Sequence, residues 1–277
     1  MALPLHLTAS QRLWHVGVRL AAGLGFAFML VPIVIIIPIS FSSGSFLNYP
    51  LPGLSLKWYG AALAPFPWLS SFQNSLLIGA ATTVLATVLG TLAAVGLQKL
   101  QFRLKPLVVA LLISPMVVPL VITALALYFF FASLELLGSF TGMILAHTVL
   151  AIPFVVVTVS ATLSGFDHTL TRAAESLGAS PLSAFRTVTL PLIMPGIVSG
   201  AIFAFITSFD EIVVALFIAS PAQFTLPRQL FSGLRDQLDP SIVAVAVMLL
   251  ALSSLLILVV ELLRWRSELL AGRRHDP

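Results

Sequence analysis

Residues 170–195 read LTRAAESLGASPLSAFRTVTLPLIMP, a polar and charge-bearing stretch in a chain otherwise dominated by long apolar runs. The pattern predicts two short helices joined by a tight turn, placed between two apolar segments. A membrane protein that folds such an insert between two spans presents a structured surface outside the bilayer. The side of the membrane on which the insert lies therefore decides what can dock on it.

The composition of the 277-residue chain is that of a protein embedded in lipid. Hydrophobic residues make up 59% of the sequence and charged residues 9%, whereas soluble domains carry roughly 25% charged residues. Because so little charge is available to cover a water-facing surface, the bilayer must be the main solvent. The chain has no cysteine, which excludes disulfides, thiolate metal sites and cysteine nucleophiles.

Six apolar segments are long enough to cross a bilayer as helices, which takes about 20 mostly apolar residues. Their apolar runs are continuous rather than alternating, which favours an all-α protein over a barrel. The first run exceeds the roughly 7–15 residues of a signal-peptide core and predicts an uncleaved span. The predicted transmembrane helices are 20–41, 71–97, 106–132, 140–163, 195–219 and 240–263.

The distribution of Lys and Arg orients these spans, because cytoplasmic loops carry an excess of basic residues. With the N-terminus inside, eleven of them fall on the cytoplasmic side, and three, Lys57, Arg228 and Arg235, fall outside. This bias predicts cytoplasmic termini, a cytoplasmic segment 1–19, a six-span domain 20–263 with a cytoplasmic insert at about 166–191, and a basic tail 264–277. The eleven are Arg12, Arg19, Lys99, Arg103, Lys105, Arg172, Arg186, Arg264, Arg266, Arg273 and Arg274.

Two patterns inside the spans concern helix packing. Ala86, Gly90 and Ala94 repeat every four residues, a spacing that lets another helix approach closely. We expect this small-residue stripe to pack within the chain rather than against another subunit. Prolines interrupt several spans, and each removes one backbone hydrogen bond and predicts a kink. These prolines are Pro32, Pro38, Pro115, Pro119 and Pro153.

The insert carries start and stop signals for its two helices. Residues 171–177 predict the first helix, and Gly178 suits its end because glycine adopts a left-handed conformation without strain. Ser180 and Pro181 supply an N-cap and a first-turn proline for the second helix. We expect this second helix to run to about residue 187 and to be stopped by Leu190 and Pro191, ahead of the fifth span.

One face of the first insert helix is thin. Leu170, Ala173, Ala174 and Leu177 fall on a common face by their helical spacing. The small size of the two alanines would let a partner surface come close.

The spacing of these residues resembles the EAA loop of ABC importer permeases. The string Ala173-Ala174-x-x-x-Gly178-x9-Val188-x-Leu190-Pro191 is similar to the family pattern Glu-Ala-Ala, three residues, Gly, nine residues, Ile-x-Leu-Pro. In that family the loop forms a coupling helix that inserts into a groove of the ATPase subunit. The resemblance implies ATPase-coupling roles for Arg172, Ala173, Ala174, Glu175, Gly178, Ala179, Val188, Leu190 and Pro191.

The sequence departs from the family pattern at two positions. Val188 stands where the family has Ile, which is a minor change, but Arg172 stands where it has Glu. A salt bridge inferred from the family Glu therefore does not carry over. Glu175, three residues further along the helix, could supply a negative charge nearby.

Further segments extend the resemblance over nearly the whole chain. Residues 55–59 (SLKWY), 73–76 (QNSL) and 208–214 (SFDEIVV) look like the same permeases, and most like the second permease subunit of spermidine/putrescine-type importers. Permeases for opines, thiamine and ferric iron share parts of these segments, so those substrates stay open.

The resemblance implies a set of partners. It predicts half of a translocation pathway for a small, polyamine-like cation in a bacterial inner membrane. The expected partners are a homologous second permease subunit, an ATPase dimer that binds ATP and Mg²⁺, and a periplasmic substrate-binding protein.

Asp210 and Glu211 form the only adjacent acidic pair inside a predicted span. A carboxylate at the bilayer centre costs about 3 kcal/mol, so it usually faces a bundle interior or water. Since adjacent positions of one helix point about 100° apart, we expect one acid to line a pathway and the other to contact a helix. With Phe209 they are the candidate substrate pathway or gate. A structural ion pair with an outer arginine or with a partner subunit is the alternative.

No pattern in the sequence indicates an enzyme. The GxxxxGK[ST] phosphate loop is absent, so ATP hydrolysis is expected in a partner chain. The sequence offers no metal-ligand cluster or nucleophile–base arrangement, and His147 is expected to be a hydrogen-bonded packing residue. Two alternatives are an ion-gradient-driven transporter that uses intramembrane carboxylates such as Asp210, and a non-transporting membrane scaffold.

Overall fold

A computed structural model describes residues 8–99, 103–236 and 240–272, and within these ranges every regular element is a helix. This confirms the predicted all-α class. The chain divides into two compact units. The terminal unit comprises residues 1–64 with 233–277, and the central unit comprises residues 65–232.

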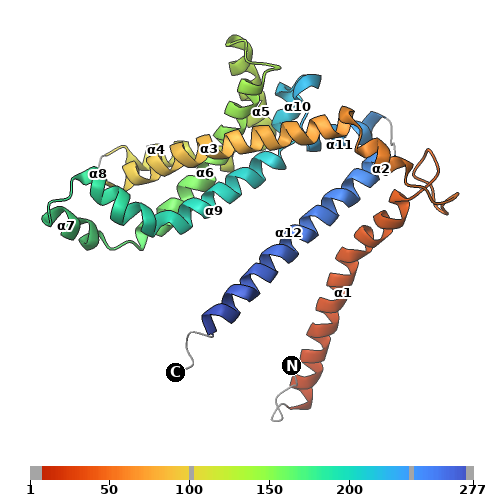
Figure 1. The fold of residues 1–277 in the computed structure, drawn as a ribbon, viewed down its shortest axis with the longest axis horizontal. Helices are drawn as coiled ribbons and strands as arrows, with labels where there is room; N and C mark the ends of the chain where they lie inside the picture. The colour runs from red at the N-terminus through yellow and green to blue at the C-terminus, as the bar shows by residue number, and fades with distance from the viewer. Residues whose placement is uncertain (1–7, 100–102, 237–239, 273–277) are drawn as a thin grey trace. The chain divides into compact units, whose positions relative to one another are not determined.

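The terminal unit contains α1 (Ala9–Ser40), the short α2 (Lys57–Ala62) and α12 (Ser241–Gly272), and α12 packs against both α1 and α2 (Figure 1). Helix α1 begins well before the predicted span at residue 20. A capping box explains this early start, because Thr8 Oγ1 accepts from Gln11 N and Gln11 Oε1 accepts from Thr8 N.

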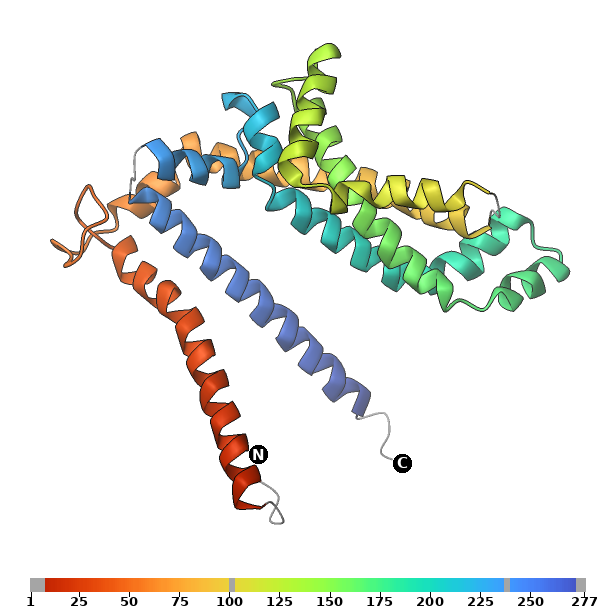
Figure 2. The ribbon, with the colours of Figure 1, turned by 180° about the vertical axis from the view of Figure 1, so that it is seen from behind.

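The core of the central unit is a bundle of α3 (Ser70–Lys99), α6 (Phe140–Ser164) and α9 (Leu190–Phe209), each packed against the other two (Figures 1 and 2). Small residues permit this packing. A Cβ added at Gly90 would lie 2.7 Å from Val155 Cβ, and one at Gly200 would lie 2.7 Å from Thr158 Oγ1. The predicted stripe of Ala86, Gly90 and Ala94 therefore packs within the chain, as expected.

The third predicted span, 106–132, is not one continuous helix. It consists of α4 (Lys105–Val117) and α5 (Leu120–Ser133), which meet at an angle of 106°. The break follows from Pro119, because proline disfavours the helical conformation for the residue before it. Val118 accordingly adopts φ −69° and ψ 136°, in the extended region.

The fifth predicted span, 195–219, is also interrupted. Helix α9 ends at Phe209, Asp210 is its C-cap, and a separate short helix, α10 (Val213–Ile218), follows. The expectation that Asp210 and Glu211 are adjacent positions of one helix was wrong. The Glu211 carboxylate accepts hydrogen bonds from Val214 N and Ala215 N, and these bonds start a new helix instead of continuing the old one.

At its other end α9 is continuous with the insert, so the predicted stop at Leu190 and Pro191 was also wrong. Helix α8 (Pro181–Ala184), a π turn (Phe185–Thr189) and α9 form one 29-residue helical stretch, Pro181–Phe209. Leu190 N donates to Phe185 O, five residues back. This wider turn accommodates Pro191, whose ring would clash with the preceding turn of a regular α-helix.

Four helical stretches are long and apolar enough to cross a membrane, and the bent pair α4–α5 is a fifth candidate. Helix α12 carries a shorter apolar stretch, Ser241–Leu255. The chain is therefore a membrane protein, while the count of six spans stays a prediction. Residues 1–7 and 273–277, which belong to the predicted terminal segments, lie outside the described residues. The four stretches are Leu13–Ser40, Pro65–Gln98, Phe140–Ser164 and Pro181–Phe209.

The remaining elements flank the bundle. Helix α7 (His168–Ser176) follows α6, while a 3-10 turn (Pro221–Gln223) and α11 (Leu226–Asp236) follow α10. The start of α3 anchors this last segment, because Asn74 Nδ2 donates to two of its backbone carbonyls and Ser75 Oγ accepts from Leu226 N.

Candidate functional site

The first candidate site is the insert, which begins with α7. Asp167 caps this helix, since its Oδ1 accepts from Thr169 N at 2.9 Å. Hydrogen bonds from Thr169 lower the pKa of the Asp167 carboxyl, which keeps the cap ionised. Because this cap precedes residue 171, α7 starts three residues earlier than the sequence pattern predicts.

The turn after α7 is the one expected from Gly178. This residue has φ +92°, a left-handed conformation that favours glycine. Gly178 N donates to Glu175 O at 3.0 Å and Ala179 N donates to Ala174 O at 3.1 Å, which is a Schellman motif. Ser180 Oγ then accepts from Ser183 N, and Pro181 begins α8. The turn chemistry of the insert was therefore predicted correctly.

Two polar contacts attach the insert to the bundle. Gln98 Nε2, near the end of α3, lies 2.8 Å from Leu163 O of α6 and 3.0 Å from His168 Nε2 of α7. Thr171 Oγ1 lies 3.2 Å from Thr189 Oγ1, which joins α7 to the π turn. Sequence reasoning missed both contacts. For the contacts of Gln98, the only indication in the sequence is a single amide side chain at the end of an apolar span.

The rest of α7 presents an apolar face outward. Leu177 is 90% exposed, and Leu170 and Ala173 on the same face are also exposed. Ala174, in contrast, is half-buried. The thin face predicted from the sequence is therefore open at Ala173 but partly covered at Ala174.

The other predicted coupling residues fall into two groups. Arg172 and Glu175 are exposed on α7, and no carboxylate among the described residues lies within 4.0 Å of the Arg172 guanidinium. Val188 and Leu190 are half-buried and Pro191 is exposed, where the π turn meets α9. The proposed coupling roles of both groups stay predictions.

The second candidate site is the break between α9 and α10. Glu211 is buried, and its two oxygens accept from Val214 N at 2.8 Å and Ala215 N at 3.1 Å. Its Oε2 also lies 3.7 Å from His147 Nε2 of α6, and His147 Nδ1 shares a 2.8 Å hydrogen bond with Ser208 Oγ. His147 is fully buried. It is thus the hydrogen-bonded packing residue that was expected.

Asp210 differs from its neighbour because it is exposed and, among the described residues, its carboxylate has no hydrogen-bond or salt-bridge partner. It lines a cavity of about 600 Å³, here called the central cavity. Phe209 is not among the lining residues, and its ring stacks on Phe205 instead.

The walls of the central cavity bring both helix breaks together. Residues 115–120 at the α4–α5 bend form one wall, and residues 206–207 and 210–212 at the α9–α10 break contribute another. Leu150 and Phe154 of α6 lie between them. Irregular backbone at membrane depth is tolerated only where it is buried in protein or lines a water-filled cavity. The two breaks thus border one cavity, and the carboxylates of Asp210 and Glu211 are both among its lining residues.

Comparison with known proteins matches residues 86–267 to the model of the family described as "Binding-protein-dependent transport system inner membrane component". The chain is 34% identical over 239 residues to the spermidine/putrescine transport system permease protein PotC of Escherichia coli (strain K12), covering 86% of this chain and 90% of PotC. It is 35% identical over 244 residues to the putrescine transport system permease protein PotI of the same strain, covering 86% and 85%.

Two further matches are a relative that shares a shorter part of the chain and a solved structure. The trehalose transport system permease protein SugB of Mycobacterium tuberculosis (strain CDC 1551 / Oshkosh) is 36% identical over 161 residues, covering 57% of this chain and 58% of SugB. A chain in the crystal structure of a bacterial ABC transporter involved in the import of the acidic polysaccharide alginate matches with a TM-score of 0.72 at 16% identity. That match covers 95% of this chain and 99% of the other, and it shows a shared fold.

Proposed function

The chain belongs to the family of binding-protein-dependent transport system inner membrane components, and on this premise we propose that it forms half of an ATP-driven import pathway for a small polyamine-like cation. As a member of this family it is a permease subunit of an ATP-binding-cassette importer. The substrate, the partners and the path of coupling belong to the proposal.

The observation that carries the coupling mechanism is the continuous helical stretch Pro181–Phe209. At about 1.5 Å per residue it spans roughly 40 Å. One end is the insert, where the exposed face of α7 would dock on an ATPase subunit. The other end is capped by Asp210, which lines the central cavity. A displacement of the insert by ATP-driven closure of the ATPase dimer would reach the cavity along this one element.

The chemistry of the central cavity supports a polyamine-like substrate. Asp210 supplies one carboxylate without a partner among the described residues, which suits an ammonium group. The side chains of Val117, Leu120 and Leu150 give the rest of the cavity apolar walls, which suit the methylene chain between two ammonium groups. Curated relatives that share most of the chain are permeases of spermidine/putrescine and putrescine transport systems.

The proposed assembly contains chains besides this one. A homologous second permease subunit would complete the pathway, a periplasmic protein would deliver the substrate, and an ATPase dimer would bind ATP and Mg²⁺. The excess of basic residues on one side supports cytoplasmic N- and C-termini and a cytoplasmic insert, with the chain in a bacterial inner membrane.

The test is uptake of radiolabelled putrescine into proteoliposomes that contain the two permease subunits, the ATPase and the binding protein. Asp210→Asn is expected to lower uptake about tenfold or more, the loss expected for a charge-assisted hydrogen bond worth about 1.5–3 kcal/mol. Glu135→Gln is the matched control, because it removes an exposed carboxylate that does not line the cavity. Co-purification of the ATPase should be unchanged in both variants.

Three results would contradict parts of the proposal. Uptake that persists without the ATPase would favour the ion-gradient alternative. Normal uptake by Asp210→Asn would remove this residue from the pathway. Competition for uptake by an opine, thiamine or ferric iron, but not by putrescine, would reassign the substrate while leaving the permease role intact.

A further inference from the structure

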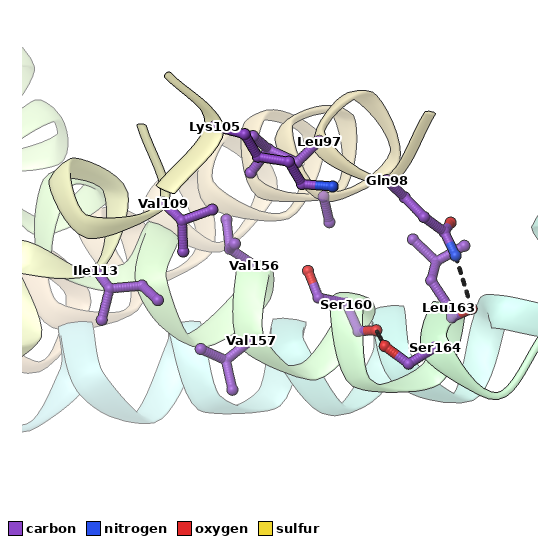
Figure 3. A pocket seen from close by; sticks show the side chains of 11 residues that line it. Leu97, Gln98, Lys105, Val109, Ile113, Val156, Val157, Ser160, Leu163 and Ser164 are labelled. Atoms are coloured by element: carbon purple, nitrogen blue, oxygen red, sulfur yellow. Dashed lines mark hydrogen bonds between the residues drawn. The ribbon is translucent and has the colours of Figure 1, made fainter. Parts of the chain in front are cut away.

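A second cavity of the central unit lies between α3, α4 and α6, at the ends of α3 and α6 that adjoin the insert (Figure 3). Its volume is about 380 Å³, within the range of small-ligand sites. The transport mechanism proposed above uses none of its residues for substrate. This second cavity is here called the α3–α4–α6 cavity.

The polar groups of this cavity gather at one end. Lys105, the first residue of α4, extends its ammonium group into the space, and the Ser160 hydroxyl points into it from α6 on the opposite side (Figure 3). Neither group has a hydrogen-bond or salt-bridge partner within residues 8–99, 103–236 and 240–272. Gln98 and Ser164 line the same end but already donate to backbone carbonyls, Gln98 to Leu163 O and Ser164 to Ser160 O.

The other end of the cavity is apolar. Val109 and Ile113 continue along α4 from Lys105, and Ile113 lies eight residues, or about 12 Å, further along the helix. Val157 of α6 faces them and is 44% exposed. The space therefore changes from polar to apolar along α4 and is bordered by an exposed apolar side chain.

Few acidic residues lie near Lys105 along the chain to balance its positive charge. Between residues 71 and 166 the only acidic residue is Glu135, which follows the far end of α5. Lys105 is half-buried, whereas Arg103, two residues earlier, is exposed and does not line the cavity. The nearest acidic residue after α6, Asp167, is already engaged by Thr169 as the cap of α7. This end of the cavity therefore favours an occupant that carries negative charge.

We propose that the α3–α4–α6 cavity binds an anionic phospholipid of the cytoplasmic leaflet. Lys105 contacts the headgroup phosphate, Ser160 donates a hydrogen bond to it, and the first part of an acyl chain lies along Val109, Ile113 and Val157. Basic pockets between transmembrane helices at the cytoplasmic face take this class of ligand. A free anion would leave the apolar 12 Å without a partner, whereas a phospholipid fills both ends.

The bound lipid would act on a defined element. Helix α4 packs on α6 beside this cavity, and it leads into the bend at Pro119 that lines the central cavity. Filling the space between α4 and the bundle would hold α4 in place by contacts that the protein alone does not supply.

The experiment uses the full-length chain, assembled with its partner subunits, in nanodiscs that contain phosphatidylglycerol or phosphatidylcholine with a photoactivatable acyl chain. Cross-linked peptides are mapped by mass spectrometry. Phosphatidylglycerol is expected to label residues 109–113 and 157 about fivefold more than phosphatidylcholine, as expected for one interfacial lysine. Lys105→Gln should abolish this preference and Lys105→Arg should retain it. Arg103→Gln should change it less than twofold, because Arg103 does not line the cavity and so does not contact a lipid bound there.

Three outcomes overturn the proposal. Equal labelling by the two lipids would show that the α3–α4–α6 cavity has no headgroup preference. Loss of labelling when millimolar glycerol 3-phosphate is added would assign the site to a soluble anion. Labelling of the isolated chain that disappears in the assembled complex would assign the α3–α4–α6 cavity to a subunit interface. Because the readout is lipid attachment, a wrong transport substrate would leave this result unaffected.

Discussion

Replacing Glu211 should destabilise α10 locally. Glu211 is 5% exposed and its carboxylate bonds two backbone N–H groups at the start of α10. Glu211→Ala removes both acceptors and leaves Val214 N and Ala215 N buried without partners. Val214 and Ala215 are themselves fully buried in the intact protein.

The magnitude follows from the two bonds. A hydrogen bond to a charged acceptor contributes about 1.5–3 kcal/mol, so Glu211→Ala should cost about 3–6 kcal/mol in the local opening free energy. Glu211→Gln replaces one of the two acceptor oxygens by an amide NH2 group, which cannot accept a hydrogen bond, and should cost about half as much. Asp210→Asn is the matched control, since no hydrogen bond to its carboxylate is formed among the described residues.

The assay is hydrogen–deuterium exchange of the amides of α10 (Val213–Ile218), measured on the purified complex in nanodiscs. A loss of about 3 kcal/mol corresponds to exchange roughly 100-fold faster. Exchange in Asp210→Asn should stay within about threefold of the unmodified protein. If Glu211→Ala also exchanged within threefold, Glu211 would not hold the start of α10, and the account of the break given above would be refuted.

Two further predictions concern the insert and the bundle. Ala173→Glu should abolish ATP-driven uptake and ATPase co-purification, because it places a charge on the exposed face of α7, while Ala173→Ser should retain both; normal coupling in Ala173→Glu would exclude docking on that face. Gly90→Ala should lower the free energy of unfolding of the purified chain by about 1–3 kcal/mol through overpacking against Val155. The better helix propensity of alanine should offset part of this loss. Gly96→Ala in the same helix meets no atom within 4 Å and should be neutral or stabilising, so equal effects of the two substitutions would contradict the close packing on Val155.

The features that sequence predicted well are those fixed by local chemistry. The turn at Gly178 and the cap at Ser180 depend only on the backbone conformations that glycine, serine and proline favour, and the structure has both. The packing of Gly90 within the chain also followed from a short-range pattern. Gly196 and Gly200 form the same kind of spacing on α9 and contact Thr162 and Thr158 of α6, so a search for that spacing would have paired α9 with α6.

The break at Glu211, which sequence missed, combines local hydrogen bonds with a contact between distant segments. Glu211 ends one helix and starts another because its carboxylate bonds forward to Val214 and Ala215, and it can remain buried there beside His147 of α6. Nothing in the residues near position 211 reveals that His147 and Ser208 are neighbours, since they lie 61 residues apart in sequence. The sequence pattern identified the acidic pair as a candidate site but wrongly predicted that both acids lie in one continuous helix.

The prolines show why residue type alone could not locate the breaks. Pro153 lies inside α6 and is fully buried, and Pro191 lies near the start of α9 behind a π turn, yet both helices continue through them. Pro119, in contrast, separates α4 from α5 at 106°. The difference lies in what surrounds each residue. Pro153 is fully buried in the bundle of α3, α6 and α9, whereas Pro119 is exposed and borders the central cavity. Irregular backbone in a membrane protein is tolerated where it lines such a cavity, which explains why the helix breaks at Pro119 and not at Pro153.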